Sequence, residues 1–391
     1  MSNASDQQTN GSSTFAFKAV DGINLLMDVY SPSCHRPSYT ADGSSCPIVV
    51  YFHGGGLTVG NRNSWFPHWL YRRMTAAGCA FASVEYRLAP PSTGHDILTD
   101  VQDAFHFVLR ELNGHLLQRN NGHNAEITTP IFQIDPGRIA VVGTSSGGLC
   151  AYLAAMHAVP SPKVILSMYG MGGDMLTTHY FMPKQEVFFR GRELLDPARF
   201  SEYLYPACRR LPATANSPLA YHPPSSPTPG YPANPRMQLA RLYFQLGTYL
   251  DYYTGHHEPS LSAALQGAAN TPSHSGRELD ADMLMSLIPS DLLHLFPQYS
   301  ISKSTTGLRR WPATFLVHGT ADTAIRADES RNLHAILRRA DVDVTLRLVE
   351  GEEHSFDYVQ DAEGLFGGEG GLFDEASDFL LRHLGVTGAQ P

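Results

Sequence analysis

The sequence is poor in cysteine and carries no concentration of positive charge. Its five cysteines among 391 residues are an odd number without paired spacing. This does not indicate the disulfide framework of a secreted protein, although a bond between Cys34 and Cys46 stays open. Acidic residues outnumber basic ones by 37 to 28, and no basic run is interleaved with aromatic residues. Nucleic acid is therefore not an expected partner.

Long hydrophobic runs are also absent. No stretch approaches the roughly 20 apolar residues that span a membrane. Residues 1–14 are polar, lack the basic start and apolar core of a signal peptide, and are expected to be disordered. We predict a soluble cytoplasmic protein without a membrane span. Its oligomeric state stays open, a homodimer being one option.

What the sequence does contain is an alternation of short apolar runs with helix-like stretches. Continuous apolar runs are typical of strands buried on both faces, so the pattern predicts an α/β fold. We expect a mostly parallel twisted sheet with helices on both faces. It should begin with a hairpin, strands 15–20 and 23–30, around Asp21-Gly22. Residues 113–130 are expected to form a surface loop. The further strands are expected at 47–52, 80–86, 138–142, 164–169, 314–317 and 344–349.

The alternation stops at Gly170 and resumes near residue 311. We therefore expect a core of residues 15–169 and 311–391, with a cap or lid inserted over 170–310. A structureless loop of that length is implausible in a compact domain, so the cap is predicted to be mainly helical.

Within the cap, helices are expected near 237–252 and 281–295, the second broken at Pro289. Aromatic side chains are frequent in its first half. They could line an apolar acyl or aromatic pocket, or they could form the core of the cap itself, and both interpretations stay open. These residues are Tyr180, Phe181, Phe188, Phe189, Tyr243, Phe244, Tyr249, Tyr252 and Tyr253.

The apolar run 138–142 leads into Gly143-Thr144-Ser145-Ser146-Gly147 and then into a helical pattern. A serine at the tip of a strand-to-helix turn, with a glycine two residues away on each side, is the nucleophile-elbow pattern. The strained turn crowds both flanking positions, so only small residues fit there. Ser145 has glycine on both sides, whereas Ser146 would place Thr144 in a crowded position. We therefore predict Ser145 as the nucleophile and Ser146 as a backbone N–H donor. A Gly/Ser-rich turn without chemistry is the alternative.

A serine hydroxyl needs a base to take its proton, and the base needs an acid to orient it. Asp322 and His354 each follow a predicted strand, in the chain order serine, acid, histidine. In parallel sheets the ligand crevice lies at these strand ends. Among rival acids, Asp328 falls in the following helix, while Glu352 and Glu353 are too near His354 in sequence. The prediction is therefore Asp322 as acid and His354 as base.

The segment His53-Gly54-Gly55-Gly56 follows the buried run 47–52. Glycines permit close backbone approach and leave N–H groups unshielded, which suits the negative charge of an acyl-transfer transition state. A flexible glycine turn with a structural histidine is the alternative. The position upstream of the serine elbow favours an oxyanion loop.

Together, four segments resemble the hormone-sensitive-lipase-like branch of the α/β-hydrolase superfamily, which includes many small carboxylesterases. The resemblance covers about residues 47–170 and 312–385. The family's cap comes largely from the N-terminus, whereas the larger insertion here is 170–310. The segments that carry the resemblance are His53-Gly54-Gly55-Gly56, Glu85-Tyr86-Arg87-Leu88-Ala89-Pro90, Gly143-Thr144-Ser145-Ser146-Gly147-Gly148 and Gly351-Glu352-Glu353-His354-Ser355-Phe356.

The resemblance implies an α/β-hydrolase fold and a site made from three separate parts of the chain. By this resemblance the triad is Ser145, Asp322 and His354, and the oxyanion donors are Gly55, Gly56 and Ser146.

We therefore predict a serine hydrolase that needs no cofactor and no metal. It would cleave a carboxylic ester, lactone or thioester through an acyl-enzyme, on a small to medium apolar or polyketide-like metabolite. His256-His257 has no spaced third metal ligand and indicates a surface loop, and His318 is expected to support the acid turn. Two alternatives stay open. One is a biosynthetic enzyme that uses the same site for acyl transfer or carbon–carbon condensation or cleavage; the other is a non-catalytic ligand-binding receptor.

Overall fold

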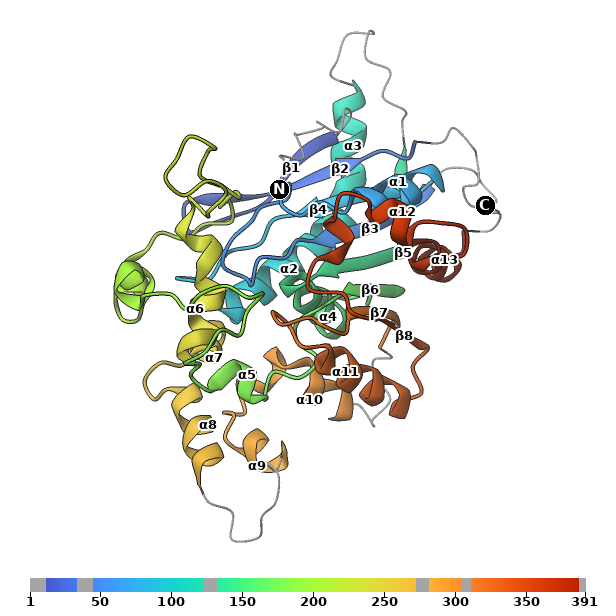
Figure 1. Ribbon diagram of the computed structural model, residues 1–391. Helices are drawn as coiled ribbons and strands as arrows, with labels where there is room; N and C mark the ends of the chain where they lie inside the picture. Colours follow the sequence, from blue (N-terminus) through green and yellow to red (C-terminus); the bar gives the residue numbers. More distant parts are fainter. Residues whose placement is uncertain (1–11, 34–44, 122–131, 272–280, 304–310, 387–391) are drawn as a thin grey trace.

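An eight-stranded sheet runs through the middle of the protein, in the order β1-β2-β4-β3-β5-β6-β7-β8 (Figure 1). The pairs from β4 to β8 are parallel, while β1 and β2 are antiparallel to their neighbours, so the predicted α/β fold is confirmed. The computed structural model describes residues 12–33, 45–121, 132–271, 281–303 and 311–386. The strands are β1 (Ser12–Val20), β2 (Ile23–Tyr30), β3 (Ser45–Phe52), β4 (Ala80–Val84), β5 (Gln133–Thr144), β6 (Val164–Met168), β7 (Ala313–Gly319) and β8 (Val344–Val349).

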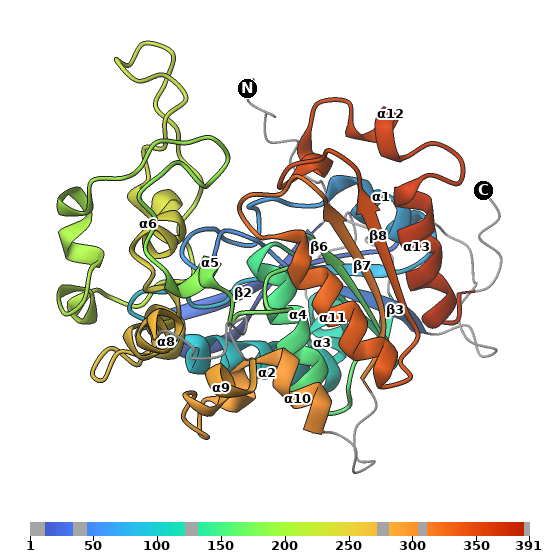
Figure 2. The same cartoon turned by 60° about the horizontal axis from the view of Figure 1, so that its bottom comes forward.

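Strand β3 shows why the central strands are apolar throughout. Successive side chains of a strand point to opposite faces. Ile48 and Val50 join one buried cluster, and Val49 and Tyr51 join the other. Helices cover both faces (Figure 2). One face carries α1 (His68–Ala76), α12 (Ala362–Phe366) and α13 (Leu372–His383), and the other carries α2 (Gly94–Arg110), α3 (Leu112–Asn121), α4 (Ser146–His157), α10 (Pro297–Lys303) and α11 (Ala327–Arg339).

The first two strands form the predicted hairpin around Asp21-Gly22, where both residues have positive φ. β1 begins at Ser12, three residues earlier than expected. The rest of the segment predicted to be disordered, residues 1–11, lies outside the described residues.

Helix α3 corrects the prediction of a surface loop over 113–130. The side chain of Asn113 exchanges two hydrogen bonds with the backbone of Ile134, at 2.9 and 2.7 Å, and Leu112 and Leu116 are buried. Tertiary contacts of this kind fix a short helix whose own sequence pattern is weak. Residues 122–131 lie outside the described range. In the part of the chain that the structure describes, no helix combines the length and apolarity needed to cross a membrane.

The cap lies between β6 and β7, and its prediction as mainly helical is wrong for residues 182–234. Only two short 3₁₀ turns occur there. This stretch is rich in proline, which lacks the N–H group that a helix interior requires. The cap elements are α5 (Thr178–Phe181), η1 (Pro197–Tyr203), η2 (Ala207–Arg210), η3 (Pro235–Gln238), α6 (Leu239–Leu246), α7 (Tyr249–Thr254), α8 (Leu261–Asn270), α9 (Ala281–Ser286) and η4 (Leu293–Leu295).

Both predicted cap helices are interrupted. The first is divided into α6 and α7 at Gly247, which has a left-handed φ of 66°. The second ends at Ser286, before Pro289, and is followed by η4. Helix α10 packs against α4 and α11 of the core. We therefore propose that the cap ends before Pro297 and not at residue 310.

The aromatic residues of the cap pack mainly on one another. The rings of Tyr243 and Tyr252 stack 3.6 Å apart, and those of Phe244 and Tyr249 stack at 4.5 Å. Seven of the nine side chains named above are buried, and the other two, Phe188 and Phe189, are partly buried. They form the core of the cap, and any contact with a bound molecule would come from an edge of this cluster.

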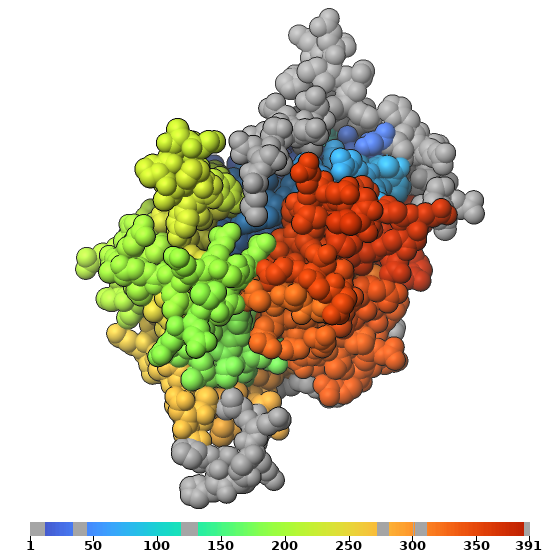
Figure 3. Space-filling model, viewed as in Figure 1, coloured from blue at the N-terminus to red at the C-terminus, as the bar shows by residue number. Residues whose placement is uncertain are grey.

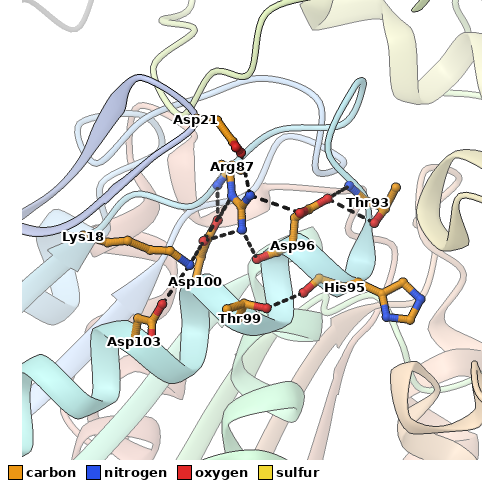
Figure 4. A network of polar contacts seen from close by, with 9 residues as sticks. All are labelled: Lys18, Asp21, Arg87, Thr93, His95, Asp96, Thr99, Asp100 and Asp103. Atoms are coloured by element: carbon orange, nitrogen blue, oxygen red, sulfur yellow. Dashed lines mark hydrogen bonds and ion pairs between the residues drawn. The ribbon is translucent and has the colours of Figure 1, made fainter. Parts of the chain in front are cut away.

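An ion-pair network holds the segment after β4 (Figure 4). The Arg87 guanidinium lies 2.9 Å from the buried carboxylate of Asp100 on α2 and 2.8 Å from Asp21 in the hairpin turn. Lys18 of β1 also reaches Asp100, at 2.7 Å. A buried carboxylate is tolerated when it is paired and hydrogen-bonded in this way. The network joins the hairpin, α2 and the loop that leads towards the cap.

Candidate active site

Ser145 stands at the tip of the turn between β5 and α4, with φ of 55° and ψ of −124°. A Cβ added to Gly143 would lie 2.0 Å from the carbonyl oxygen of Gly147. A Cβ on Gly147 would lie 2.1 Å from that of Phe52. Both flanking positions are therefore closed to any larger residue, as the sequence predicted. Ser146 is the first residue of α4, and its side chain is buried.

The structure brings Ser145, His354 and Asp322 into one hydrogen-bonded line. The Nε2 atom of His354 is 2.9 Å from the Oγ atom of Ser145, and its Nδ1 atom is 2.6 Å from Oδ2 of Asp322. Asp322 follows β7 and His354 follows β8, so the parallel sheet delivers both to the edge where β5 ends. With Asp322 ionised, Nδ1 of His354 carries the proton and Nε2 can accept one from the serine hydroxyl. The line can therefore move a proton away from Ser145.

The carboxylate of Asp322 is held on both oxygens. Oδ1 accepts hydrogen bonds from the backbone N–H groups of Ala324 and Ile325, each at 2.9 Å. Burial alone would raise the pKa of Asp322, but the charges and hydrogen bonds of His354 and His318 outweigh it and hold this pKa well below its usual range. Asp322 therefore remains ionised throughout the physiological pH range.

His318 supports the acid turn, as expected. Its Nε2 atom lies 2.8 Å from the carbonyl oxygen of Ile325 and 3.2 Å from Oδ2 of Asp322. Both neighbours are acceptors, so Nε2 carries the proton. Nδ1 is then free to accept from the Ser330 hydroxyl at 2.7 Å.

The rival acids Asp328 and Glu353 bind other partners than His354. Asp328 lies in α11 and pairs with Arg331. Glu353 accepts a hydrogen bond from the hydroxyl of Thr323 and forms an ion pair with Arg190 of the cap at 3.0 Å. Figure 3 shows the green cap segment near residue 190 lying against the orange and red segments that carry the acid and histidine loops. Neither Asp328 nor Glu353 has a hydrogen bond to His354 in the described part of the chain.

The segment His53–Gly56 passes close to Ser145, because a Cβ on Gly54 would lie 3.1 Å from Cβ of Ser145. Two carbonyl groups of this segment are held from behind. Nδ1 of His53 donates to the carbonyl of Gly54 at 2.7 Å, and Thr58 donates to that of Gly55 through its N–H and its hydroxyl, both at 3.1 Å. Burial lowers the pKa of His53 to about 4, so the ring is neutral.

Because the peptide is planar and trans, these carbonyl contacts also determine where the neighbouring N–H groups point. In such a peptide the C=O and N–H groups point in opposite directions. Holding the carbonyls of Gly54 and Gly55 therefore fixes the N–H directions of Gly55 and Gly56. Among the described residues, neither N–H donates to a protein acceptor. The N–H of Ser146, in the first turn of α4, also lacks an intrahelical acceptor. These three N–H groups are thus without a protein acceptor among the described residues.

Comparisons with known proteins agree with this fold. A family model described as an alpha/beta hydrolase fold matches residues 49–232. An alpha/beta hydrolase superfamily protein from Enterococcus faecalis has a TM-score of 0.52 at 15% identity, covering 92% of this chain and 96% of that one. An esterase from Thermogutta terrifontis has a TM-score of 0.51 at 15% identity, covering 98% and 96%. The chain therefore has the α/β-hydrolase fold.

Curated relatives of this chain include much longer proteins. The non-reducing polyketide synthase ausA of Aspergillus calidoustus is 28% identical over 379 residues, which are 93% of this chain and 14% of the synthase. The 5-methylorsellinic acid synthase of Aspergillus terreus is 29% identical, covering 95% and 13%. The probable carboxylesterase M8 of Phoma sp. is 32% identical over 158 residues, covering 40% and 46%. The chain thus spans about a seventh of the length of these synthases.

Sequence reasoning missed one support of His354. The ring of Tyr169, just after β6, meets the His354 ring edge-on at 4.7 Å. Its hydroxyl donates to the buried carboxylate of Asp357 at 2.6 Å, which also accepts from Nε1 of Trp69 at 3.3 Å. Burial raises the pKa of Asp357 to about 6. The only signals in the sequence were that Tyr169 ends an apolar run and that Asp357 lies three residues after His354.

No metal centre is seen in the part of the chain that the structure describes. No group of three His, Cys, Asp or Glu side chains there is arranged to hold an ion. His256 and His257 lie in a partly exposed loop, and the ring of His257 stacks on Tyr205 at 4.3 Å.

Proposed function

We propose that this α/β-hydrolase is a serine hydrolase that cleaves a carboxylic ester, lactone or thioester through an acyl-enzyme. The observation that carries the proposal is the continuous line from Ser145 Oγ through His354 to Asp322, at 2.9 and 2.6 Å. A serine hydroxyl is a weak nucleophile at neutral pH, and this arrangement supplies the base that it lacks.

The proposed reaction has two halves. In the first, Nε2 of His354 takes the proton of Ser145 while Oγ attacks the acyl carbonyl. The protonated histidine then gives this proton to the departing alcohol or thiol. In the second half, water gives a proton to His354 and attacks the acyl-serine, and the proton returns to Ser145 as the carboxylic acid leaves. Asp322 stabilises the histidine cation in both halves.

Both halves pass through a tetrahedral intermediate with a negative oxygen. We propose that the N–H groups of Gly55, Gly56 and Ser146 bind this oxygen. Loss of one such donor typically costs about 3–4 kcal/mol of transition-state stabilisation. The neutral His53 and the hydroxyl of Thr58 keep the two glycine peptides aligned for that task.

The relatives named as polyketide synthases support a polyketide-like acyl group as the substrate. We therefore propose a second function as the alternative. An acceptor other than water would attack the same acyl-serine, which would give acyl transfer or condensation. A non-catalytic receptor is less well supported, because the three side chains of the proposed triad are aligned.

The mechanism is tested by comparing Ser145→Ala with Ser146→Ala on a series of p-nitrophenyl esters of increasing chain length. We expect Ser145→Ala to lower kcat by about 10⁴-fold or more. Ser146→Ala should lose less than about tenfold, because its proposed contribution is a backbone N–H. Full activity of Ser145→Ala would contradict the mechanism.

Hydrolysis and transfer are separated by running the reaction in ¹⁸O-labelled water. Hydrolysis places one labelled oxygen in the product acid. Unlabelled product, or product joined to an added alcohol or thiol acceptor, would instead support the transfer function.

A further inference from the structure

The cap reaches directly into the glycine-rich oxyanion loop, here defined as residues 53–61. The hydroxyl of Tyr249, on cap helix α7, donates to the carbonyl oxygen of Gly56 at 3.1 Å. Ala240 of α6 lies over the same residue, since a Cβ on Gly56 would come within 2.3 Å of its Cβ. Gly56 is therefore held and covered by the cap and not by the sheet.

A second contact joins cap and loop through Thr58. The Thr58 hydroxyl lies 3.1 Å from the backbone carbonyl of Arg236, as well as from that of Gly55. The buried guanidinium of Arg236 returns a hydrogen bond to the Thr58 carbonyl at 3.2 Å and another to the Pro90 carbonyl at 2.5 Å. The loop is thus tied to η3 of the cap and, through Arg236, to the segment after β4.

Gly56 needs such support because its own conformation is permissive. Its φ of 64° lies in the left-handed region, where glycine moves at little cost. Thr58 fixes the peptide before the Cα of Gly56, and Tyr249 fixes the peptide after it. With both peptides held, the N–H of Gly56 has one direction available to it. With either released, the donor can rotate away from the proposed oxyanion position.

Tyr249 is itself well placed to serve as a fixed donor. Its ring stacks on Phe244 at 4.5 Å and meets Tyr180 edge-on at 5.6 Å, and its side chain is buried. The Tyr180 hydroxyl in turn contacts Glu329 of core helix α11. The hydroxyl of Tyr249 is therefore anchored through aromatic packing to both cap and core.

We propose that Tyr249 is a positioning residue of the oxyanion hole, and that the cap completes this hole through two tethers, Tyr249 to Gly56 and Arg236 to Thr58. The inference rests on the proposed function, since it concerns the same oxyanion. The consequence is that the cap contributes to the rate of the chemical step as well as to substrate choice.

The test compares Tyr249→Phe with Tyr243→Phe. Both variants remove one buried hydroxyl from the cap, because that of Tyr243 donates to the Tyr203 carbonyl at 2.8 Å, within the cap. Three quantities are measured: kcat and KM for a p-nitrophenyl ester, the inhibition constant of a trifluoromethyl ketone that forms a tetrahedral adduct, and the thermal unfolding midpoint. The rate at which a fluorophosphonate labels Ser145 is measured in all variants.

In Tyr249→Phe we expect kcat and the labelling rate to fall about tenfold, with KM within about twofold of wild type. The inhibition constant of the trifluoromethyl ketone should rise by a similar factor. Tyr243→Phe should leave kcat, KM, the labelling rate and the inhibition constant unchanged. This should hold even if its unfolding midpoint falls as far as that of Tyr249→Phe. Equal kinetics in the two variants would overturn the inference.

A second pair tests the other tether and covers the case in which Tyr249→Phe does not fold. Thr58→Val removes the hydroxyl at similar size and should show the same kinetic losses, whereas Thr58→Ser should restore most of the lost rate. Failure of serine to restore it would contradict the tether. If wild type is neither labelled nor active, the proposed function fails too. If wild type is labelled and Tyr249→Phe is labelled equally fast, only this inference fails.

Discussion

The core and the cap hold their residues by different means. The core is a ladder of paired strands, and its reacting groups stand where three of those strands end. The described cap has no strand, and much of its order comes from stacked rings and from side chains that hydrogen-bond to backbone carbonyls. The side chains of the proposed triad are therefore placed by paired strands. The proposed tethers from the cap depend on individual side chains, Tyr249 and Arg236.

The largest effect is expected from a comparison of one substitution in the core with one substitution in the cap. Asp322→Asn keeps the shape of the acid but removes the charge that orients His354, so we expect kcat to fall by about 10³–10⁴-fold. Asp251→Asn alters a buried aspartate of the cap, which accepts from the Ser262 N–H and the Ser260 hydroxyl, each at 2.7 Å. Steady-state kinetics should show less than about tenfold loss there. A comparable loss in both variants would remove the distinction between the regions.

A smaller effect is expected where core and cap meet. Glu329 of α11 accepts from the N–H groups of Gly172 and Gly173, at 2.7 and 3.2 Å, and contacts the Tyr180 hydroxyl. Burial raises the pKa of Glu329 to about 8, and the charge of Asp174 adds to this. The ordinary value is about 4.3, so between these two pH values the folded protein binds more protons than the unfolded chain.

Stability should therefore fall as pH rises from about 4 to about 8, and Glu329→Gln should abolish this part of the dependence. Thermal unfolding at pH 5.5, 7 and 9 checks it. Between pH 5.5 and 9, wild type should lose on the order of 3 kcal/mol relative to Glu329→Gln. Glu375→Gln, on the exposed ion pair with Arg347, serves as the control and should show no divergence. If the stabilities of wild type and Glu329→Gln change equally with pH, the raised pKa assigned to Glu329 is refuted.

The smallest effect is expected at a glycine of the cap, and a glycine of the core elbow with opposite surroundings serves as the contrast. Gly267 lies inside cap helix α8, and nothing lies within 4 Å of a Cβ placed there. Gly267→Ala should raise the free energy of unfolding by about 0.5–1 kcal/mol, because alanine favours the helix. Gly147→Ala in the core elbow should instead prevent correct folding. Denaturant unfolding measures both, and a destabilised Gly267→Ala would show that the cap is packed more tightly than the structure indicates.

Much of the core and its site followed from the sequence because both obey local rules. Ser145, Asp322 and His354 each follow an apolar strand, and the glycines around Ser145 report a steric need. Helix α3 was missed because tertiary contacts, not periodicity, fix it. Residues 182–234 were expected to be helical although their many prolines disfavour a helix interior. Tyr249 was named only as one of many cap aromatics, since a hydroxyl that meets a distant carbonyl leaves no pattern in the chain.

We propose Ser145 as the nucleophile of this protein. The most direct measurement is to treat the active protein with a limiting series of fluorophosphonate, follow residual esterase activity, and locate the adduct by peptide mass spectrometry. We expect activity to fall in proportion to a single modified peptide, with the added mass on Ser145. Esterase activity that persists while Ser145 is fully modified, or an adduct on another residue that abolishes activity, would contradict it.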